Sequence, residues 1–154
     1  MRPLASEYLF RLTLFAGPTP HPIGAGPRGR RRVTPITGGH FTGPRLQGTV
    51  AGEACAAWVL VGDDGAVRLE ARLSLQTSDG AWIYMHYPGI GHGSPEVMAR
   101  VNSGQAASPD EYYFRTVAQF ETAAEPYAWL NTCFAVGVGE RAAAGPVYDF
   151  HQIL

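Results

Sequence analysis

Side chains that could carry out acid–base chemistry recur at alternate positions in several short stretches of this sequence. Glu121 is the first candidate for proton transfer, because a carboxylate enclosed among aromatic rings has its pKa raised by desolvation. Arg72 could bind a substrate carboxylate or stabilise an enolate oxygen, and Tyr84 and His86 could donate or relay a proton. The sequence therefore predicts a catalytic group of Glu121, Arg72, Tyr84 and His86.

A second set of residues would bind the substrate beside this group. Large rings would supply shape and stacking, and an amide would orient a carbonyl. The predicted substrate-binding residues are Trp129, Asn131, Tyr127, Arg115, Arg45, Trp82 and Glu70. The competing interpretation is structural: Glu121 would form an ion pair with Arg115 or Arg72, and the two flanking arginines would neutralise Glu70.

The elements that must position these residues have the two-residue period of β-strands. We predict strands at residues 8–14, 33–36, 45–50, 58–61, 67–75, 81–87, 111–122, 127–138 and 147–153. Residues 63–65 and 78–80 predict hairpin turns, Gly38-Gly39 predicts another turn, and residues 17–32 are predicted to form a long loop. One short helix is predicted after Ser94, which can cap it, with Pro95 in its first position and Gly104 at its end.

Composition favours one all-β domain over residues 1–154. The 19 glycines and 12 prolines suit short strands joined by tight turns, and a helical bundle would not tolerate them. We therefore predict a mostly antiparallel, closed or nearly closed β-barrel with one short helix.

Two arrangements of the barrel compete. In the first, the polar faces of the strands are the solvated exterior and the aliphatic faces fill the core. In the second, the polar and aromatic faces line the lumen, which would explain why large rings lie beside arginines and glutamates. We favour the second arrangement, because a ligand pocket combines apolar walls with a few convergent polar groups.

Charge and residue types exclude several classes of function. The net charge is −1 and all 12 cationic side chains are arginines, so no lysine is present to form a Schiff base with pyridoxal phosphate. We expect no cofactor, no metal, no nucleic-acid partner and no membrane association. The arginine run at residues 28–32 could touch RNA or an anion, but a solvated loop is preferred. With two cysteines and no signal-peptide pattern, a cytoplasmic location is expected.

Several stretches resemble one known family. They include Gly38-Gly39-His40-Phe41-Thr42-Gly43-Pro44-Arg45-Leu46-Gln47-Gly48, Tyr113-Phe114-Arg115-Thr116, Phe120-Glu121-Thr122 and Pro126-Tyr127-Ala128-Trp129-Leu130-Asn131. The chain resembles the domain-of-unknown-function 3237 family, also called uncharacterised protein family 0311. This resemblance implies a barrel similar to allene oxide cyclase and dirigent proteins. One position departs from the family pattern: Ala57 stands where the resemblance implies an aspartate, so activity that needs this carboxylate is in doubt.

The favoured function is a cofactor-independent cyclase, isomerase or lyase. It would hold a small, partly apolar metabolite of polyketide or phenolic type in the lumen and act on it by general acid–base catalysis. Such a reaction would belong to a biosynthetic pathway. One alternative is a barrel that binds a small ligand without catalysis. Another is a structural subunit, and in each case a homo-oligomer is expected, with a dimer favoured.

Overall fold

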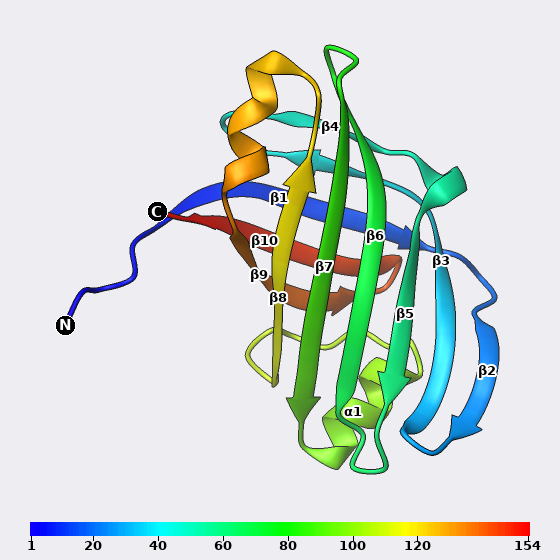
Figure 1. The fold of residues 1–154 in the computed structure, drawn as a ribbon. Coiled ribbons are helices and arrows are strands. Elements are labelled where there is room, and N and C mark those ends of the chain that lie inside the picture. Colours follow the sequence, from blue (N-terminus) through cyan, green and yellow to red (C-terminus); the bar gives the residue numbers. More distant parts are fainter.

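The computed structural model describes residues 1–154 as ten antiparallel strands in one sheet that closes on itself (Figure 1). The strands are β1 Ser6–Ala16, β2 His21–Gly26, β3 Gly29–Thr42, β4 Gln47–Val50, β5 Ala56–Val61, β6 Val67–Thr77, β7 Trp82–Gly93, β8 Tyr112–Glu121, β9 Ala135–Ala142 and β10 Gly145–Ile153. The barrel closes because β1 pairs with β10 on one side and with the second half of β3 on the other.

The barrel wall has eight strand positions although the chain has ten strands. Strands β1 and β2 follow each other along the same side of β3, and β4 and β5 both lie between β3 and β6. The predicted antiparallel barrel is therefore confirmed.

One α-helix and two 3-10 helices complete the structure, and two of them mark opposite ends of the barrel (Figure 1). Helix α1, Pro95–Asn102, lies at one end, and η2, Glu125–Thr132, lies at the other; η1 is Gly52–Ala54. Ser94 accepts a hydrogen bond from the Val97 amide at 3.3 Å, which confirms the predicted cap of α1. None of the helices is both long and apolar enough to cross a bilayer.

Three predicted boundaries are wrong. Residues 17–32 are not a loop, because they form β2 and the start of β3. Gly38-Gly39 is not a turn but part of the continuous strand β3, where Gly39 lies so close to β1 that a Cβ there would be 2.2 Å from the Thr13 carbonyl oxygen. Residues 125–132 form η2, because Pro126 starts a helical turn whose buried residue is Leu130.

The η2 half of the barrel is filled by a packed core. Phe10 lies at its centre, with ring centroids 5.7 Å from Phe41, 6.2 Å from Phe120 and 5.4 Å from Phe150. Leu130 of η2 is fully buried and belongs to the same hydrophobic cluster. The aromatic cluster and Leu130 therefore occupy this half of the lumen.

Candidate binding site inside the barrel

The predicted catalytic group lies on the outside of the barrel. Glu121, Arg72 and Tyr84 are exposed, and His86 is half-buried on the same outer face. Their strand neighbours, such as Leu73 and Met85, are buried inside. The prediction that the polar face lines the lumen is therefore wrong, and the competing arrangement with an aliphatic interior is correct.

The physical reason lies in what a two-residue period can tell. It sorts side chains into two faces but does not say which face points inward, particularly when both carry large rings. The predicted ion pairs do not form either: the two ion pairs of the structure are Arg11–Asp149 and Arg100–Glu111.

Two of the predicted substrate-binding residues fasten η2 to the barrel. The Tyr127 hydroxyl donates to Asp79 Oδ1 at 3.0 Å. Asn131 accepts from the Thr122 amide at 2.8 Å and donates to the Thr122 carbonyl at 3.0 Å. These contacts give Tyr127 and Asn131 a structural role at the closed end of the barrel.

The other predicted substrate-binding residues are also on or near the outer surface. The Arg45 guanidinium carbon lies 3.6 Å from the ring centroid of the half-buried Trp129, a stacked cation–π contact. Arg115 is half-buried over a tyrosine ring, and Trp82 and Glu70 are exposed. None of them reaches the interior cavity described below.

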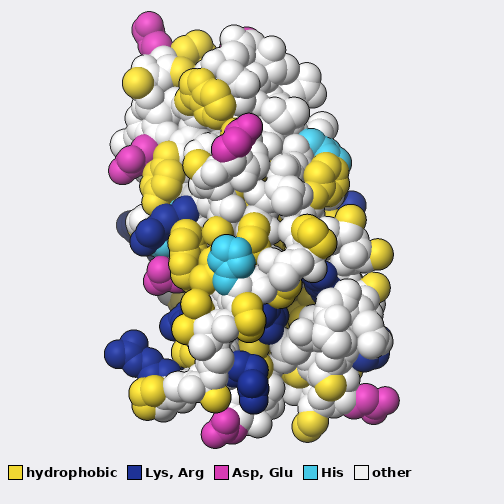
Figure 2. Space-filling model, turned by 90° about the vertical axis from the view of Figure 1, so that its right-hand side faces the viewer, with side chains coloured by type: hydrophobic (Ala, Val, Ile, Leu, Met, Phe, Trp, Pro, Cys, Tyr) yellow, Lys and Arg dark blue, Asp and Glu magenta, His cyan; other side chains and the backbone are white.

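A shallow groove of about 660 Å³ does bring Glu70 and Arg72 together on the exterior. Strands β3, β5, β6 and β7 form this outer groove, and Arg31, Trp58 and Arg68 also line it. Figure 2 views the right-hand side of Figure 1 and shows that hydrophobic and arginine side chains gather over the lower half of that side. The outer groove is open to water, which screens its charges and weakens any electrostatic contact there.

The interior cavity, of about 310 Å³, lies in the other half of the barrel, directly beneath α1. Its walls include Val59, Val67 and Phe114 from the strands and Met98 and Val101 from α1. A volume of this size lies at the lower end of the usual range for small-molecule pockets. The lumen can therefore hold a small organic ligand at the α1 end.

The aromatic rings of the cavity wall can pack closely against the strands only where the neighbouring residue inside the barrel is small. A Cβ at Gly139 of β9 would lie 2.5 Å from a ring carbon of Phe114 and 3.0 Å from one of Tyr148. Glycine at this position lets the two rings pack against the strand and define the cavity wall.

Polar groups converge on the same cavity. Arg32 and Thr34 reach it from β3, Arg141 from β9, Tyr112 from β8 and Asn102 from the end of α1. Five buried side-chain polar atoms in the whole protein lack a hydrogen-bond partner, and three belong to this lining: Tyr112 OH, Asn102 Oδ1 and Arg141 Nε. Each of these three atoms is covered by protein and costs free energy because it has no partner, although the residues that carry them line the cavity.

The two arginines carry charge that nothing in the lining neutralises. Neither Arg32 nor Arg141 forms an ion pair, and the cavity lining contains no Asp or Glu. Burial lowers the pKa of Arg32, and the charge of Arg141 lowers it further. Ala57, where the family resemblance implies an aspartate, lines this cavity and leaves it without that carboxylate.

Two tyrosines of the lining are held in the protonated form. Burial raises the pKa of Tyr112. The backbone amide of Arg141 lies near the Tyr112 hydroxyl and partly offsets this rise, although the two groups do not have the geometry of a hydrogen bond. Burial likewise raises the pKa of Tyr148. Both phenols can therefore donate a proton or a hydrogen bond across the neutral range.

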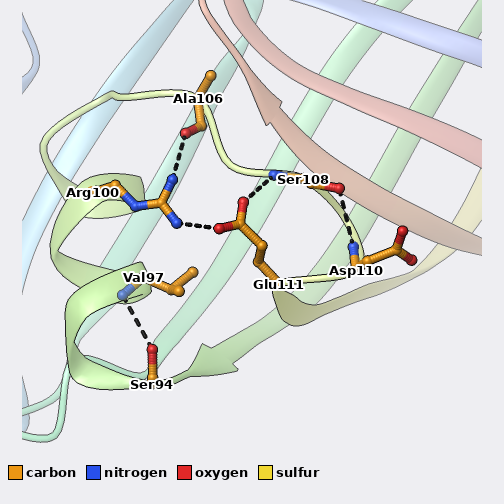
Figure 3. Close-up of polar contacts among 7 residues, drawn as sticks. All are labelled: Ser94, Val97, Arg100, Ala106, Ser108, Asp110 and Glu111. Atoms are coloured by element: carbon orange, nitrogen blue, oxygen red, sulfur yellow. Dashed lines mark hydrogen bonds and ion pairs between the residues drawn. The ribbon is translucent and has the colours of Figure 1, made fainter.

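The segment of residues 94–111, called the lid segment here, contributes Met98, Val101 and Asn102 to the cavity lining. Figure 3 shows the polar contacts within it. Arg100 forms an ion pair with Glu111 and donates to the Ala106 carbonyl at 3.4 Å. The Ser108 amide donates to Glu111 Oε2 at 2.8 Å. The segment is also joined to the barrel, because the Ala107 amide donates to the Arg141 carbonyl at 3.0 Å, Asn102 donates to the Gly65 carbonyl at 3.2 Å and Met98 is buried.

Sequence reasoning missed the lining residues because their strands were judged by polarity. Arg32 fell in the arginine run that we expected to be a solvated loop, and Arg141 and Tyr112 were not singled out. One signal was available: Gly137 and Gly139 alternate with Val138 in β9, and small residues at alternate positions mark the crowded inner face. Arg141 continues that face.

Together, the fold and site define a closed antiparallel β-barrel with a small, partly polar cavity under a helical lid. The model of a family described as protein of unknown function (DUF3237) matches residues 4–153. The chain belongs to this family, which confirms the resemblance found in the sequence.

Known relatives agree with this assignment. The UPF0311 protein RPA1785 of Rhodopseudomonas palustris is 33% identical over 98% of this chain and 97% of its own length. Its crystal structure has a TM-score of 0.91, with 100% of this chain and 99% of that chain covered. A β-barrel-like protein of Acinetobacter baumannii has a TM-score of 0.86 at 34% identity, covering 100% of this chain and 98% of that chain.

One relative bears the name of an enzyme. The hydroalkoxylation enzyme phnH of Penicillium herquei is 30% identical over 85% of this chain and 71% of its own length. It is a distant relative, and its name describes its own reaction.

Proposed function

We propose that this protein is a cofactor-independent cyclase, isomerase or lyase that acts on a small, partly apolar metabolite in the interior cavity. The observation that carries the proposal is the convergence of the polar residues Tyr112, Asn102 and Arg141 on one largely apolar cavity. The name of the Penicillium relative supports a catalytic use of this barrel.

The chemistry that fits is addition of a hydroxyl group across a carbon–carbon double bond, or its reversal. In ring closure the O–H bond and the π bond of the alkene break, and an O–C bond and a C–H bond form, so the substrate and product have the same composition and no redox partner is needed. Arg32 and Arg141 would stabilise negative charge that develops on an oxygen conjugated to the double bond. The protonated Tyr112 would give its proton to carbon and recover one from the attacking hydroxyl.

The test is turnover of phenols whose side chain carries a double bond conjugated to a carbonyl, followed by chromatography and by deuterium incorporation at carbon in heavy water. Tyr112→Phe should lower kcat by about 10²–10⁴, the usual effect of a positioned acid or base. Tyr113→Phe is the matched control, because Tyr113 is the next residue along β8 and is exposed on the outer face. Equal rates for wild type and Tyr112→Phe would remove Tyr112 from the mechanism.

A non-catalytic ligand-binding barrel is the second candidate. The cavity lining contains no carboxylate and no histidine, and these are the usual general bases of enzymes. Native mass spectrometry of the purified protein would support this candidate if it detected a ligand that is released chemically unchanged and is not converted on prolonged incubation.

A further inference from the structure

We infer that the interior cavity selects organic anions, with a carboxylate or acidic enolate held by Arg32 and Arg141 and a flat apolar body against the barrel wall. This inference rests on the proposed function and names the substrate class of the same site. It predicts a property that turnover alone would not reveal, namely discrimination between a charged ligand and its neutral isostere.

The first argument is the missing counter-ion. Two guanidinium groups close enough for one charge to affect the other line the same cavity, and no acidic side chain lines it. Two half-buried like charges repel each other and have lost part of their hydration. An anion placed between them would remove the repulsion and restore hydrogen bonds.

The second argument is the state of Arg141. Its Nε atom is buried and has no partner, and its Nη2 lies 3.3 Å from the position that a Cβ at Gly104 would occupy. The lid segment therefore packs against this guanidinium without bonding to it. A planar guanidinium binds two oxygens in parallel, the geometry that a carboxylate or a delocalised enolate presents.

The third argument concerns the body of the ligand. Away from the arginines the cavity wall is formed by Val59, Val67, Phe114 and Met98. These side chains favour an apolar body of one or two rings and offer nothing to a small hydrated ion such as phosphate. Charge at one end and apolar surface at the other define an amphipathic organic acid.

Calorimetry with two matched ligand pairs tests the inference: 2-naphthoate against 2-naphthamide for carboxylates, and 4-hydroxycoumarin against coumarin for acidic enols. Since hydrogen bonds to a charged group are the strong ones, the anion of at least one pair should bind about 10- to 100-fold more tightly than its neutral partner. The pair with the larger ratio identifies the anion class. Inorganic phosphate should compete only weakly.

Variants separate the cavity from the outer groove, which also contains arginines. Arg141→Met and Arg32→Met should each remove the preference for the anion, whereas Arg68→Met, in the outer groove, should keep it. Neither cavity variant should lower the melting temperature of the ligand-free protein, because each removes an unpaired charge. If one of the two cavity variants fails to fold, the other still tests the preference for the anion.

Ala57→Asp supplies a test with the opposite sign. Ala57 lies on β5 diagonally across from Arg32, since Arg32 pairs with Val59 in the ladder, and such diagonal neighbours are within reach of long side chains. The new carboxylate should pair with Arg32, raise the melting temperature and weaken anion binding at least tenfold.

Three outcomes would overturn the inference. Equal affinity for anion and neutral partner in both pairs would do so while leaving the cavity and the proposed function intact. Loss of anion binding in Arg68→Met but not in Arg141→Met would move the site to the outer groove. Binding of none of the four probes would overturn it too, and the turnover test would then decide the proposed function separately.

Discussion

Replacing Tyr112 by phenylalanine should make the ligand-free protein more stable. The residue is only 6% exposed, its ring packs near that of Phe114, and its hydroxyl has no hydrogen-bond partner. A buried polar group left without a partner costs about 1–3 kcal/mol, and phenylalanine removes that cost while keeping the ring. We therefore expect the free energy of unfolding to rise by about 1 kcal/mol, which is about 2–4 °C in melting temperature for a domain of this size.

The assay is urea unfolding of ligand-free protein, followed by circular dichroism at neutral pH. Tyr113→Phe is the control: its hydroxyl lies on the exposed face of β8, so its removal should change stability by less than about 0.5 kcal/mol. Destabilisation of Tyr112→Phe by more than about 1 kcal/mol would refute the reasoning, because it would mean that the hydroxyl has a bonded partner in the free protein.

Three further predictions concern the lid, the packed core and acid stability. Ser94→Ala should cost about 1 kcal/mol in the stability of α1 by removing its cap, and should be seen as faster hydrogen exchange of the helix amides with little change in global unfolding. Phe10→Ala, at the centre of the aromatic cluster, should lower the free energy of unfolding by about 3–5 kcal/mol in the same urea assay. A hydrogen bond from Arg11, followed by its charge, lowers the pKa of Asp149, so this carboxylate stabilises the fold at neutral pH. That stabilisation is fully present above the ordinary value of about 3.9 and is lost as the pH falls through the lower folded value. Thermal melts below about pH 4 should therefore show a weaker pH dependence for Arg11→Met than for wild type.

Much of the barrel could be predicted from local patterns. The alternation in β6 and the cap at Ser94 are local signals that tertiary packing did not override. The alternation of Tyr127 and Trp129 predicts that a strand begins at residue 127, but residues 125–132 form η2. The start at Pro126 was the competing signal, and burial of Leu130 against the barrel end decided the outcome.

The site was harder to predict, because its position depends on which face of each strand is inside. Arg72 and Arg141 are both arginines in strands, yet one lies over the ring of Trp58 on the exterior and the other lines the cavity. Their immediate sequence contexts do not separate them. Only closure of the sheet, through pairing of β1 with both β10 and β3, fixes the inner face of every strand at once.

The division of the lumen into a filled half and a hollow half has a consequence for how this fold can change over time. Phe10 and Phe150 lie fully buried in the aromatic cluster, whereas Ala57 and Val101 line the cavity and are only partly buried where they pack against the core. Exchanges at partly buried lining positions such as these should therefore alter what the barrel accepts at a smaller cost to its stability than exchanges within the aromatic cluster. A scaffold organised in this way can acquire new ligand preferences through a handful of substitutions while the sheet that houses them persists.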